Sequence, residues 1–532
     1  MGHNCLVDAS RAPAGHAAPG AVRPAPPRRS TPLPEEFCLH ADAATTTDDD
    51  GTVIIGGSPL RLFRVSERAR DLMAQWREGR PVGNRGAAGL LARRLVSAGA
   101  YSPRPSTTEV AAFGLGDVTV VVPVRDRPTE LDRLLATLAP LRCIVVDDAS
   151  ADAGSTKDVA GRHGAQLVRL EANQGPAAAR NAGLAAVDRM DTPLVAFVDS
   201  DCEPSGGWLG PLLGHFDDPL VAAVAPRIVA VPSAGADGPT ARLLDLHSPL
   251  DLGPHDGPVR RGSRLTFVPS AVLVVRAAVC TTAELFDPAL RGGEDVDLVW
   301  RLNDAGWDVR YEPKSVVPHH GPATLEAHLR RRAFYGTTAG PLAVRHPGSL
   351  APMSASAWSL AVWVLTLARR PAAAVAVLGV SIGVLAARLR GLVRRPLAVA
   401  TRIAGGGTAR SALPALAGLV RAWSPALVLA LGFRRTRRAA ALALVVPALG
   451  DWLDHRDDID PVRYAAFHVA DDVAYGAGVW AGCLEAGTIE PLVPRIVWRS
   501  RVWSARSLQR SLSPGRANGH ERGPEGAPGT DA

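Results

Sequence analysis

Acidic residues stand in three groups along this 532-residue sequence, each directly after an apolar run or a pair of glycines. The groups are Asp147 and Asp148, Asp199 and Asp201, and Glu294 and Asp295. The first two groups follow β-type runs, and ligands of open α/β sheets bind beyond the carboxyl ends of the strands. Carboxylates placed there, together with substrate phosphates, are typical ligands of Mg²⁺ or Mn²⁺. The sequence therefore predicts that Asp199 and Asp201 hold a divalent cation.

Glu294 and Asp295 follow Gly292 and Gly293, which allow a loop to approach a substrate closely. A carboxylate in such a loop can take a proton from an acceptor hydroxyl, as a general base does. The alternative is an acidic helix N-terminus stabilised by the helix dipole. Asp148 has a similar alternative, because aspartate commonly caps turns and helices. A single D-x-D pair is a weak signal, so the order of all three groups indicates the site.

Basic and histidine side chains accompany the acids. Arg180 lies in a helix predicted at residues 176–187, where it either meets a diphosphate or is solvated. His319 and His320 follow a predicted strand, and they could contact a metal or a phosphate. The first strand, residues 118–124, runs into Arg125 without the G-x-G-x-x-G loop of dinucleotide-binding folds, which argues against an NAD or FAD enzyme.

Strands and helices must alternate to bring these groups together. The β-type runs lie at residues 118–124, 144–146, 167–170 and 194–198. Helical patterns that begin near residues 128, 155 and 176 separate them. Short apolar runs separated by Ala/Leu-rich helices predict βαβ units and a mostly parallel sheet. The predicted fold class is therefore α/β.

Taken together, the motifs resemble glycosyltransferase family 2, whose catalytic domain has the GT-A nucleotide-sugar-binding fold. The resemblance covers about residues 118–321 and rests on the strand that contains Pro123 and on the three acidic groups. It implies an inverting transferase that uses a nucleotide sugar and a divalent metal, Mg²⁺ or Mn²⁺. The residues that would bind the nucleotide sugar are Pro123, Arg125, Asp147, Asp148, Arg180 and Asp199, with Asp148 on the uracil base.

The same resemblance implies the remaining site residues. Asp199, Asp201 and His319 would be the metal ligands, with Asp201 binding the metal that holds the diphosphate. Asp295, with Glu294 beside it, would be the catalytic general base that activates the acceptor hydroxyl.

Three further segments, residues 56–62, 267–270 and 335–342, resemble the branch of this family that glycosylates the peptide-derived redox cofactor mycofactocin. That branch implies a peptide-derived acceptor, UDP-glucose as donor and a β-1,4-linked product. Residues 330–336 lack the Q-x-x-R-W motif of processive members, which argues against a cellulose- or hyaluronan-type polymerase. The alternatives are a membrane-associated relative acting on a lipid or cell-wall polysaccharide, and a non-catalytic scaffold of GT-A shape. No nucleic-acid partner is expected.

Composition divides the chain around this predicted GT-A domain, residues 115–345. Residues 1–35 are rich in Pro, Ala and Arg and are expected to form a disordered arm. Residues 36–102 predict a small winged-helix-like or peptide-binding-like module, which resembles small peptide-binding proteins. Residues 346–500 predict an apolar helical region, and residues 501–532 a disordered tail.

Two uncharged runs, residues 350–368 and 371–387, approach the roughly 20 residues that a spanning helix needs. Arg388 and Arg390 follow at once, which suits contact with anionic cytoplasmic lipid. We expect the region to associate with the cytoplasmic face of the membrane, as spanning helices in several passes or as surface-lying helices. Core helices packed on the catalytic domain are the alternative.

The overall composition sets few further limits. Lys and Arg number 59 against 52 Asp and Glu, a net charge of +7 that is mild for this length. The six cysteines form no C-x-x-C pair, so neither a zinc site nor a disulfide framework is predicted, and a reduced cytosolic chain is expected. The N-terminus lacks the continuous apolar segment of a signal peptide.

Overall fold

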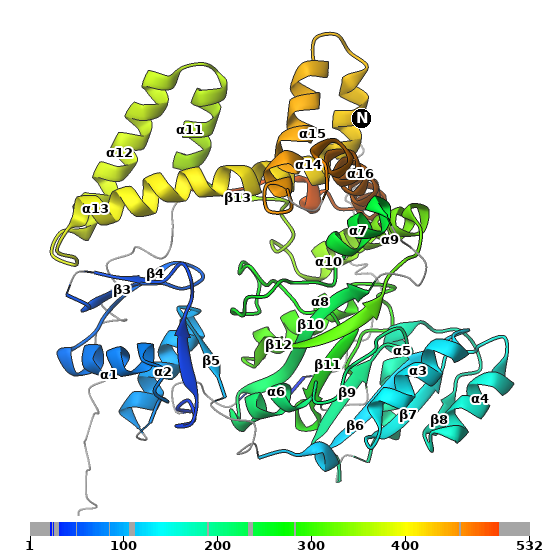
Figure 1. The fold of residues 1–532 in the computed structure, drawn as a ribbon. Helices are drawn as coiled ribbons and strands as arrows, with labels where there is room; N and C mark the ends of the chain where they lie inside the picture. The colour runs from blue at the N-terminus through cyan, green and yellow to red at the C-terminus, as the bar shows by residue number, and fades with distance from the viewer. Residues whose placement is uncertain are drawn as a thin grey trace, which may run out of the picture.

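The computed structural model of the protein describes residues 22–23, 25, 31–48, 50–83, 86–105, 112–188, 191–231, 238–280, 284–456 and 459–498. A small N-terminal module lies beside a sheet domain, and a helical unit lies beyond one edge of the sheet (Figure 1). The tail at residues 501–532 and most of the arm at residues 1–35, both expected to be disordered, lie outside the described residues.

A seven-stranded mixed sheet forms the sheet domain, in the order β12-β10-β11-β9-β6-β7-β8. Its strands are β6 Val118–Val124, β7 Arg142–Asp147, β8 Gln166–Arg169, β9 Leu194–Val198, β10 Val221–Val231, β11 Val272–Arg276 and β12 Asp308–His320. Within this sheet β11 alone runs antiparallel to its neighbours, so the prediction of a mostly parallel sheet is confirmed. Strands β6, β7, β9 and β12 therefore end at the same edge.

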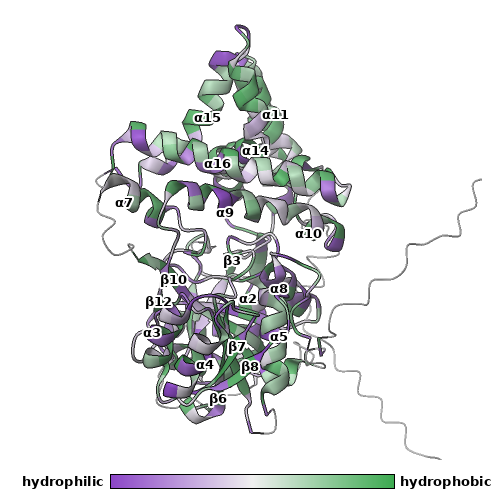
Figure 2. Cartoon of the chain, turned by 90° about the vertical axis from the view of Figure 1, so that its right-hand side faces the viewer, coloured by the Kyte–Doolittle hydropathy of each residue, from purple (hydrophilic) through white to green (hydrophobic). Residues whose placement is uncertain are grey.

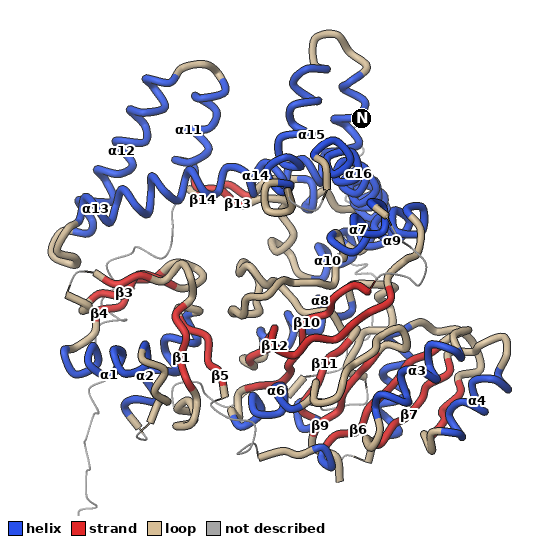
Figure 3. Tube along the Cα trace, viewed as in Figure 1, coloured by secondary structure: helices blue, strands red, loops and turns tan. Residues whose placement is uncertain are grey.

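Helices flank both faces of the sheet (Figure 3). α3 Pro128–Leu138, α4 Ala153–Arg162 and α6 Gly210–Leu213 share one hydrophobic core with the strands, and α5 Pro176–Ala186 and α8 Glu294–Asp304 share the other. Alternation along β6 produces the two layers, because Val120 and Val122 enter one core while Val121 enters the other. The helices predicted near residues 128, 155 and 176 are confirmed.

The N-terminal module contains two small antiparallel sheets and two helices. Strands β1 Cys38–Ala41 and β5 Tyr101–Arg104 pair with each other, and β2 Thr46–Thr47, β3 Val53–Gly56 and β4 Arg61–Arg64 form the second sheet. The helices are α1 Glu67–Arg77 and α2 Ala87–Ala98. Ser66 caps α1 by accepting the Ala69 N–H at 3.3 Å. Met73, Trp76 and Leu95 form the centre of the module's core.

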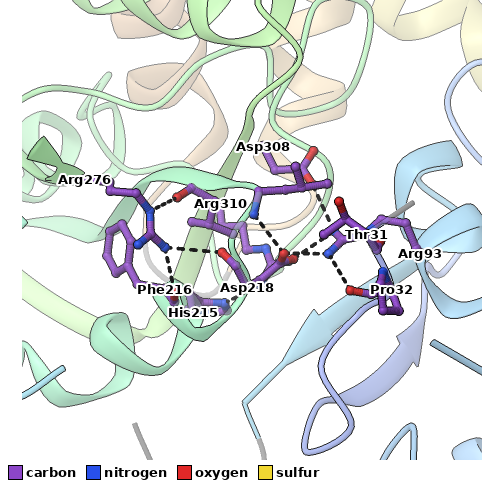
Figure 4. Close-up of polar contacts among 11 residues, drawn as sticks. Thr31, Pro32, Arg93, His215, Phe216, Asp218, Arg276, Asp308 and Arg310 are labelled. Atoms are coloured by element: carbon purple, nitrogen blue, oxygen red, sulfur yellow. Dashed lines mark hydrogen bonds and ion pairs between the residues drawn. The ribbon is translucent and has the colours of Figure 1, made fainter. Parts of the chain in front are cut away.

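A buried ion network joins the module to the sheet domain (Figure 4). Arg93 of α2 donates to both carboxylate oxygens of Asp218, at 2.5 and 2.8 Å, and Arg310 of β12 pairs with the same carboxylate. Arg93 is 2% exposed and Asp218 is fully buried. Because buried charges are stable only when paired, this network fixes the module against the sheet domain.

The described part of the predicted arm is folded. Leu33 is buried in the module's core and donates its N–H to the Gly89 carbonyl at 3.0 Å. Arg23 donates its N–H to the Val279 carbonyl of the sheet domain at 2.9 Å. These residues therefore belong to the folded protein, because they cover apolar side chains of the module and of the sheet domain.

The helical unit contains eight helices among the described residues. They are α9 Leu325–Thr337, α10 Ala339–Arg345, α11 Ala357–Leu367, α12 Pro371–Leu389, α13 Pro396–Ala400, α14 Gly406–Leu431, α15 Arg437–Trp452 and α16 Pro461–Ala486. Two helical hairpins, α11–α12 and α14–α15, project away from the sheet domain (Figure 1). The part of the chain furthest from the sheet is largely hydrophobic (Figure 2). At its base α12 packs on the module, where Leu389 and Val53 share a core.

By length and hydropathy, two described segments could cross a membrane, Pro371–Leu389 and Pro396–Leu431. The uncharged run at residues 350–368, by contrast, is not a near-spanning helix. Ser354–Ser356 forms strand β13, which pairs with β14 Arg495–Val497, and Ser356 then caps α11 by accepting the Ser359 N–H at 3.0 Å. The 11 residues of α11 rise about 16 Å, against about 30 Å of bilayer core.

Helices α9, α10 and α16 touch backbone to backbone. Gly336 and Gly340 face Gly478 and Gly482, each pair four residues apart. A Cβ on Gly478 would lie 1.9 Å from the Ala333 carbonyl oxygen, and one on Gly340 would lie 1.9 Å from the Gly482 carbonyl oxygen. Glycine at these positions therefore allows the close approach that joins α16 to α9 and α10.

Candidate active site

The predicted acids and histidine come from separate elements that converge at the carboxyl edge of the sheet. Asp147 ends β7 and Asp148 follows it, Asp199 and Asp201 follow β9, Glu294 and Asp295 begin α8, and His319 lies in the last part of β12. A shared edge for these strands follows from their parallel order, and it is the edge at which α/β sheets bind ligands.

The two acids after β7 hold the local backbone. Asp147 is fully buried and pairs with Arg169. The two oxygens of Asp148 accept backbone N–H groups, from Gln174 at 2.7 Å and from Gly175 at 2.9 Å. These bonds fix the turn that precedes α5, which is the capping role that the sequence left open for Asp148.

Arg180 joins two of the acidic groups. This residue is 3% exposed and donates to Asp199 Oδ1 at 2.6 Å and to Glu294 Oε1 at 2.9 Å. Burial alone would lower the pKa of Arg180, but the carboxylates of Asp199 and Glu294 outweigh it and raise the pKa above its ordinary value. Arg180 is therefore not a solvated helix residue, and it holds the end of β9 against the start of α8.

Asp201 has different partners from Asp199. Its Oδ2 accepts from Arg127 Nη1 at 2.6 Å, and its Oδ1 lies 3.4 Å from His319 Nε2. Burial favours the neutral form of Asp201, but His319 and Arg127 outweigh this effect and hold its pKa below the usual range. Burial raises the pKa of Asp199, although Arg180 opposes the change. Asp201 is thus the more strongly anionic member of the pair.

Asp295 has the properties of a base that works near neutral pH. Burial, followed by the charge of Glu294, raises the pKa of Asp295 to about 7. Its Oδ1 accepts the Val296 N–H at 2.8 Å, and its Oδ2 lies 3.4 Å from the Ser270 nitrogen. Gly293, at φ +76°, precedes this pair of acids in a conformation that residues with a side chain rarely adopt.

Asp201 and His319 could hold a divalent cation. A carboxylate oxygen and an imidazole nitrogen 3.4 Å apart fit Mg²⁺ or Mn²⁺ when substrate phosphates complete the coordination. His319 is buried, and its Nδ1 has no hydrogen-bond partner in the part of the chain that the structure describes. Asp199, the third predicted ligand, is paired with Arg180. No group of three His, Cys, Asp or Glu side chains is arranged for a metal among the described residues.

The two predicted residues of β6 and its following loop lie at the side of this cluster. Pro123 is half-buried and pairs in register with Val146 of β7. Arg125 is exposed and lies 3.5 Å from the carboxylate of Asp126. In the described structure neither side chain forms a hydrogen bond or ion pair with the acidic side chains of the site, whereas Arg127 does.

The sequence patterns did not predict Arg127 or Tyr335 as residues of the site. The signal for Arg127 was its place in the loop directly after the first strand, at the ligand-binding edge. Tyr335 lies on α9, and burial raises its pKa; the charge of Arg331 opposes this rise, and the charges of Asp295, Asp199 and Asp201 add to it. The phenol therefore lies in the electrostatic field of the acids.

The chain is similar in sequence to known proteins. Residues 119–276 match the family described as Glycosyl transferase family 2. The chain is 40% identical, over 485 residues, to the Pre-mycofactocin glycosyltransferase of two Mycobacterium tuberculosis strains, and the alignment covers 88% of this chain and 99% of those proteins. It is also 31% identical over 200 residues to the Succinoglycan biosynthesis protein ExoU of Rhizobium meliloti, covering 35% of this chain and 56% of that protein.

A solved structure is also similar to part of the chain. The crystal structure of residues 1–349 of S. aureus TarS aligns with 42% of this chain and 65% of its own, at 18% identity and a TM-score of 0.30.

Proposed function

This chain belongs to glycosyltransferase family 2 and is a glycosyltransferase, and we propose that it transfers glucose from UDP-glucose to pre-mycofactocin, a peptide-derived acceptor. The sheet domain has a GT-A-like α/β fold with a mixed sheet. The name of the Mycobacterium tuberculosis relatives supports the acceptor, because those proteins align with nearly the whole of this chain.

The observation that carries the proposal is the position of Asp295. This carboxylate, with a pKa near 7, lies in the first turn of α8, and Glu294, the first residue of that helix, is tied through Arg180 to the D-x-D loop. A base of this pKa is half deprotonated at neutral pH, where it can accept the proton of an attacking hydroxyl. Asp295 is therefore the proposed general base.

The other side of the site is proposed to hold the donor. Asp201 and His319 would bind a divalent cation, which neutralises charge on the diphosphate leaving group. Asp148 would accept from the uracil base, since a carboxylate has about four lone-pair positions and backbone amides use two of them. Arg180 would keep Asp199 and Glu294 in place while the donor binds.

A single displacement follows from these roles. The hydroxyl that Asp295 deprotonates attacks the anomeric carbon from the face opposite the diphosphate, so an α-linked donor yields a β-linked product. Repeated transfer would build the β-1,4-linked oligosaccharide that the resemblance implies. The N-terminal module would hold the peptide-derived acceptor, and its buried contact through Arg93 supports a fixed position beside the sheet domain.

The test is transfer by the purified full chain. UDP-[¹⁴C]glucose and pre-mycofactocin should give a labelled product with Mn²⁺, little product in EDTA, and restored product when Mn²⁺ is returned. The coupling constant of the new anomeric proton should be that of a β-glucoside. Label found on polyprenyl phosphate and absent from pre-mycofactocin would contradict the proposed acceptor in favour of the lipid alternative. Other labelled nucleotide sugars in parallel reactions would identify a different donor.

A further inference from the structure

Asp201, the carboxylate proposed to bind the divalent cation, already forms an ion pair with an arginine of the protein itself. Arg127 Nη1 lies 2.6 Å from Asp201 Oδ2, and the Arg127 side chain is 43% exposed. A half-exposed guanidinium can leave a carboxylate without opening the protein core. Its place at the carboxyl edge of β6 means that it remains near any anion bound there.

The backbone next to Arg127 is anchored to a neighbouring loop by hydrogen bonds of Asp126. Asp126, at φ +54°, donates its N–H to Ser150 Oγ at 2.9 Å, and its Oδ1 accepts the Ala151 N–H at 2.7 Å. These two bonds tie the loop after β6 to the loop after β7. The Arg127 side chain therefore extends from an anchored stretch of backbone next to Asp201.

We propose that Arg127 occupies Asp201 until the donor arrives, and then moves to the donor diphosphate. A divalent cation and a guanidinium on one carboxylate repel each other, so the metal alone binds weakly. When metal and diphosphate arrive together, the diphosphate offers Arg127 a new anion and releases Asp201 to the metal. Metal loading is thereby coupled to donor loading. This inference rests on the proposed nucleotide-sugar chemistry, and it makes Arg127 a positioning residue rather than a catalytic one.

Binding of Mn²⁺ and of UDP to the full chain, measured by calorimetry, tests this exchange. Arg127→Ala should bind Mn²⁺ without nucleotide about fivefold more tightly than the wild type, because the competing ion pair is removed. The same variant should bind UDP in saturating Mn²⁺ about tenfold more weakly, because a charge-assisted contact is lost. Arg127→Lys keeps the charge and should restore Mn²⁺ affinity to near the wild-type value.

Arg125→Ala is the matched control for metal binding. Arg125 lies in the same loop and is exposed, but it lies beside Asp126 instead of Asp201. Its loss should leave the affinity for Mn²⁺ alone unchanged. Equal or weaker Mn²⁺ binding by Arg127→Ala, or equal tightening by Arg125→Ala, would overturn the exchange. If the exchange is overturned but the wild type transfers glucose, the proposed function is retained. A wild type that binds Mn²⁺ but transfers no sugar would refute the proposed function itself.

Discussion

Asp295 determines how the proposed reaction should respond to pH. Its carboxyl group must be ionised to accept a proton, and burial together with Glu294 places its pKa at about 7. Below that pH the base is blocked by its own proton. Above it the base is free, so the rate of the chemical step should rise with pH through about 7 and then level off.

We therefore expect kcat of the wild type to rise about tenfold per pH unit below 7 and to reach a plateau near pH 8. Asp295→Asn should lower kcat by roughly 10²–10⁴-fold, because an amide cannot accept the proton, and should abolish this dependence. UDP affinity, measured by calorimetry, should stay near the wild-type value. Loss of UDP binding in the variant would make Asp295 part of the donor site instead of the base.

Asp295→Asn should raise stability while it lowers kcat. The gain in stability is therefore a control that the loss of activity does not come from unfolding. A carboxyl group with a raised pKa binds its proton more tightly in the folded chain than in the unfolded chain. The free energy of unfolding therefore falls as pH rises from about 4 to about 7, and the loss persists above that. Asp295→Asn should gain melting temperature relative to the wild type at pH 8, with a smaller gain at pH 5.

For single residues, the sequence predicted which acids and which histidine belong to the site, but not the side chains with which they pair. The three acidic groups and His319 do lie at one edge, because parallel strands end together. Arg127 and Asp201 are 74 residues apart, so their ion pair requires the neighbouring positions of β6 and β9. The burial of Asp147 against Arg169 likewise depends on the pairing of β7 with β8. Such pairings are properties of the assembled sheet.

Among the elements, the contact of α9 and α10 with α16 connects the site to the helical unit. α9 carries Tyr335, and a Cβ on Gly292 of the acidic loop would lie 3.0 Å from the Phe334 ring. The other side of α9 meets α16 through Gly336 and Gly478. The active-site loop, α9 and α16 are therefore packed in series without a gap.

Gly478→Ala should destabilise the protein by about 1–3 kcal/mol, since its Cβ would overlap the Ala333 carbonyl oxygen and the helices would have to separate. Thermal unfolding measures this loss, and kcat should fall with it because α9 moves. Gly379→Ala on α12 is the matched control. Its Cβ meets nothing within 4 Å, so the helix should gain up to about 1 kcal/mol. Equal stability of the two variants would show that the close contact is not formed.

Local patterns predicted several strands of the sheet with their bounds, as β6 and β9 show. They failed where a boundary depends on distant pairing. The absence of charge at residues 350–368 does not reveal that the helix begins as late as Ala357, after the capping residue Ser356. That boundary comes from β13, whose partner β14 lies about 140 residues further along the chain. The antiparallel insertion of β11 is equally invisible to hydrophobic periodicity.

For the whole molecule, the two helical hairpins form the surface most suited to lipid. Leu367 on α11 is 84% exposed and Leu429 on α14 is 72% exposed. Arginines lie at both hairpin turns: Arg369 and Arg370 at one, and Arg434, Arg435, Arg437 and Arg438 at the other. Exposed apolar helices with basic ends are typical of segments that associate with an anionic membrane surface. A spanning α11–α12 hairpin would place Arg369 and Arg370 on the outer side, against the positive-inside tendency. We therefore propose that the enzyme is attached to the cytoplasmic face of the membrane, where nucleotide sugars are found.

Cell fractionation tests this attachment. The wild type should sediment with membranes, resist a high-salt wash and remain after carbonate if the hairpins enter the hydrocarbon layer. Val375→Asp combined with Val380→Asp, both exposed on α12, should move most of the protein to the soluble fraction. Leu115→Asp, an exposed position on the sheet domain, should not. Wild-type protein found wholly in the soluble fraction would contradict the proposal, and release by salt alone would limit it to surface attachment.

The strand order also affects how the chain folds during its synthesis. β10, an apolar strand, pairs along its whole length with β12, which follows roughly 80 residues later. At a synthesis rate of about 5–20 residues per second, β10 waits about 4–16 s for this partner. During that interval the nascent chain carries an unpaired apolar strand edge, the state in which strands of different chains pair. We therefore expect the yield of soluble protein to depend on the rate of translation and on chaperones near the ribosome, as well as on the stability of the finished fold.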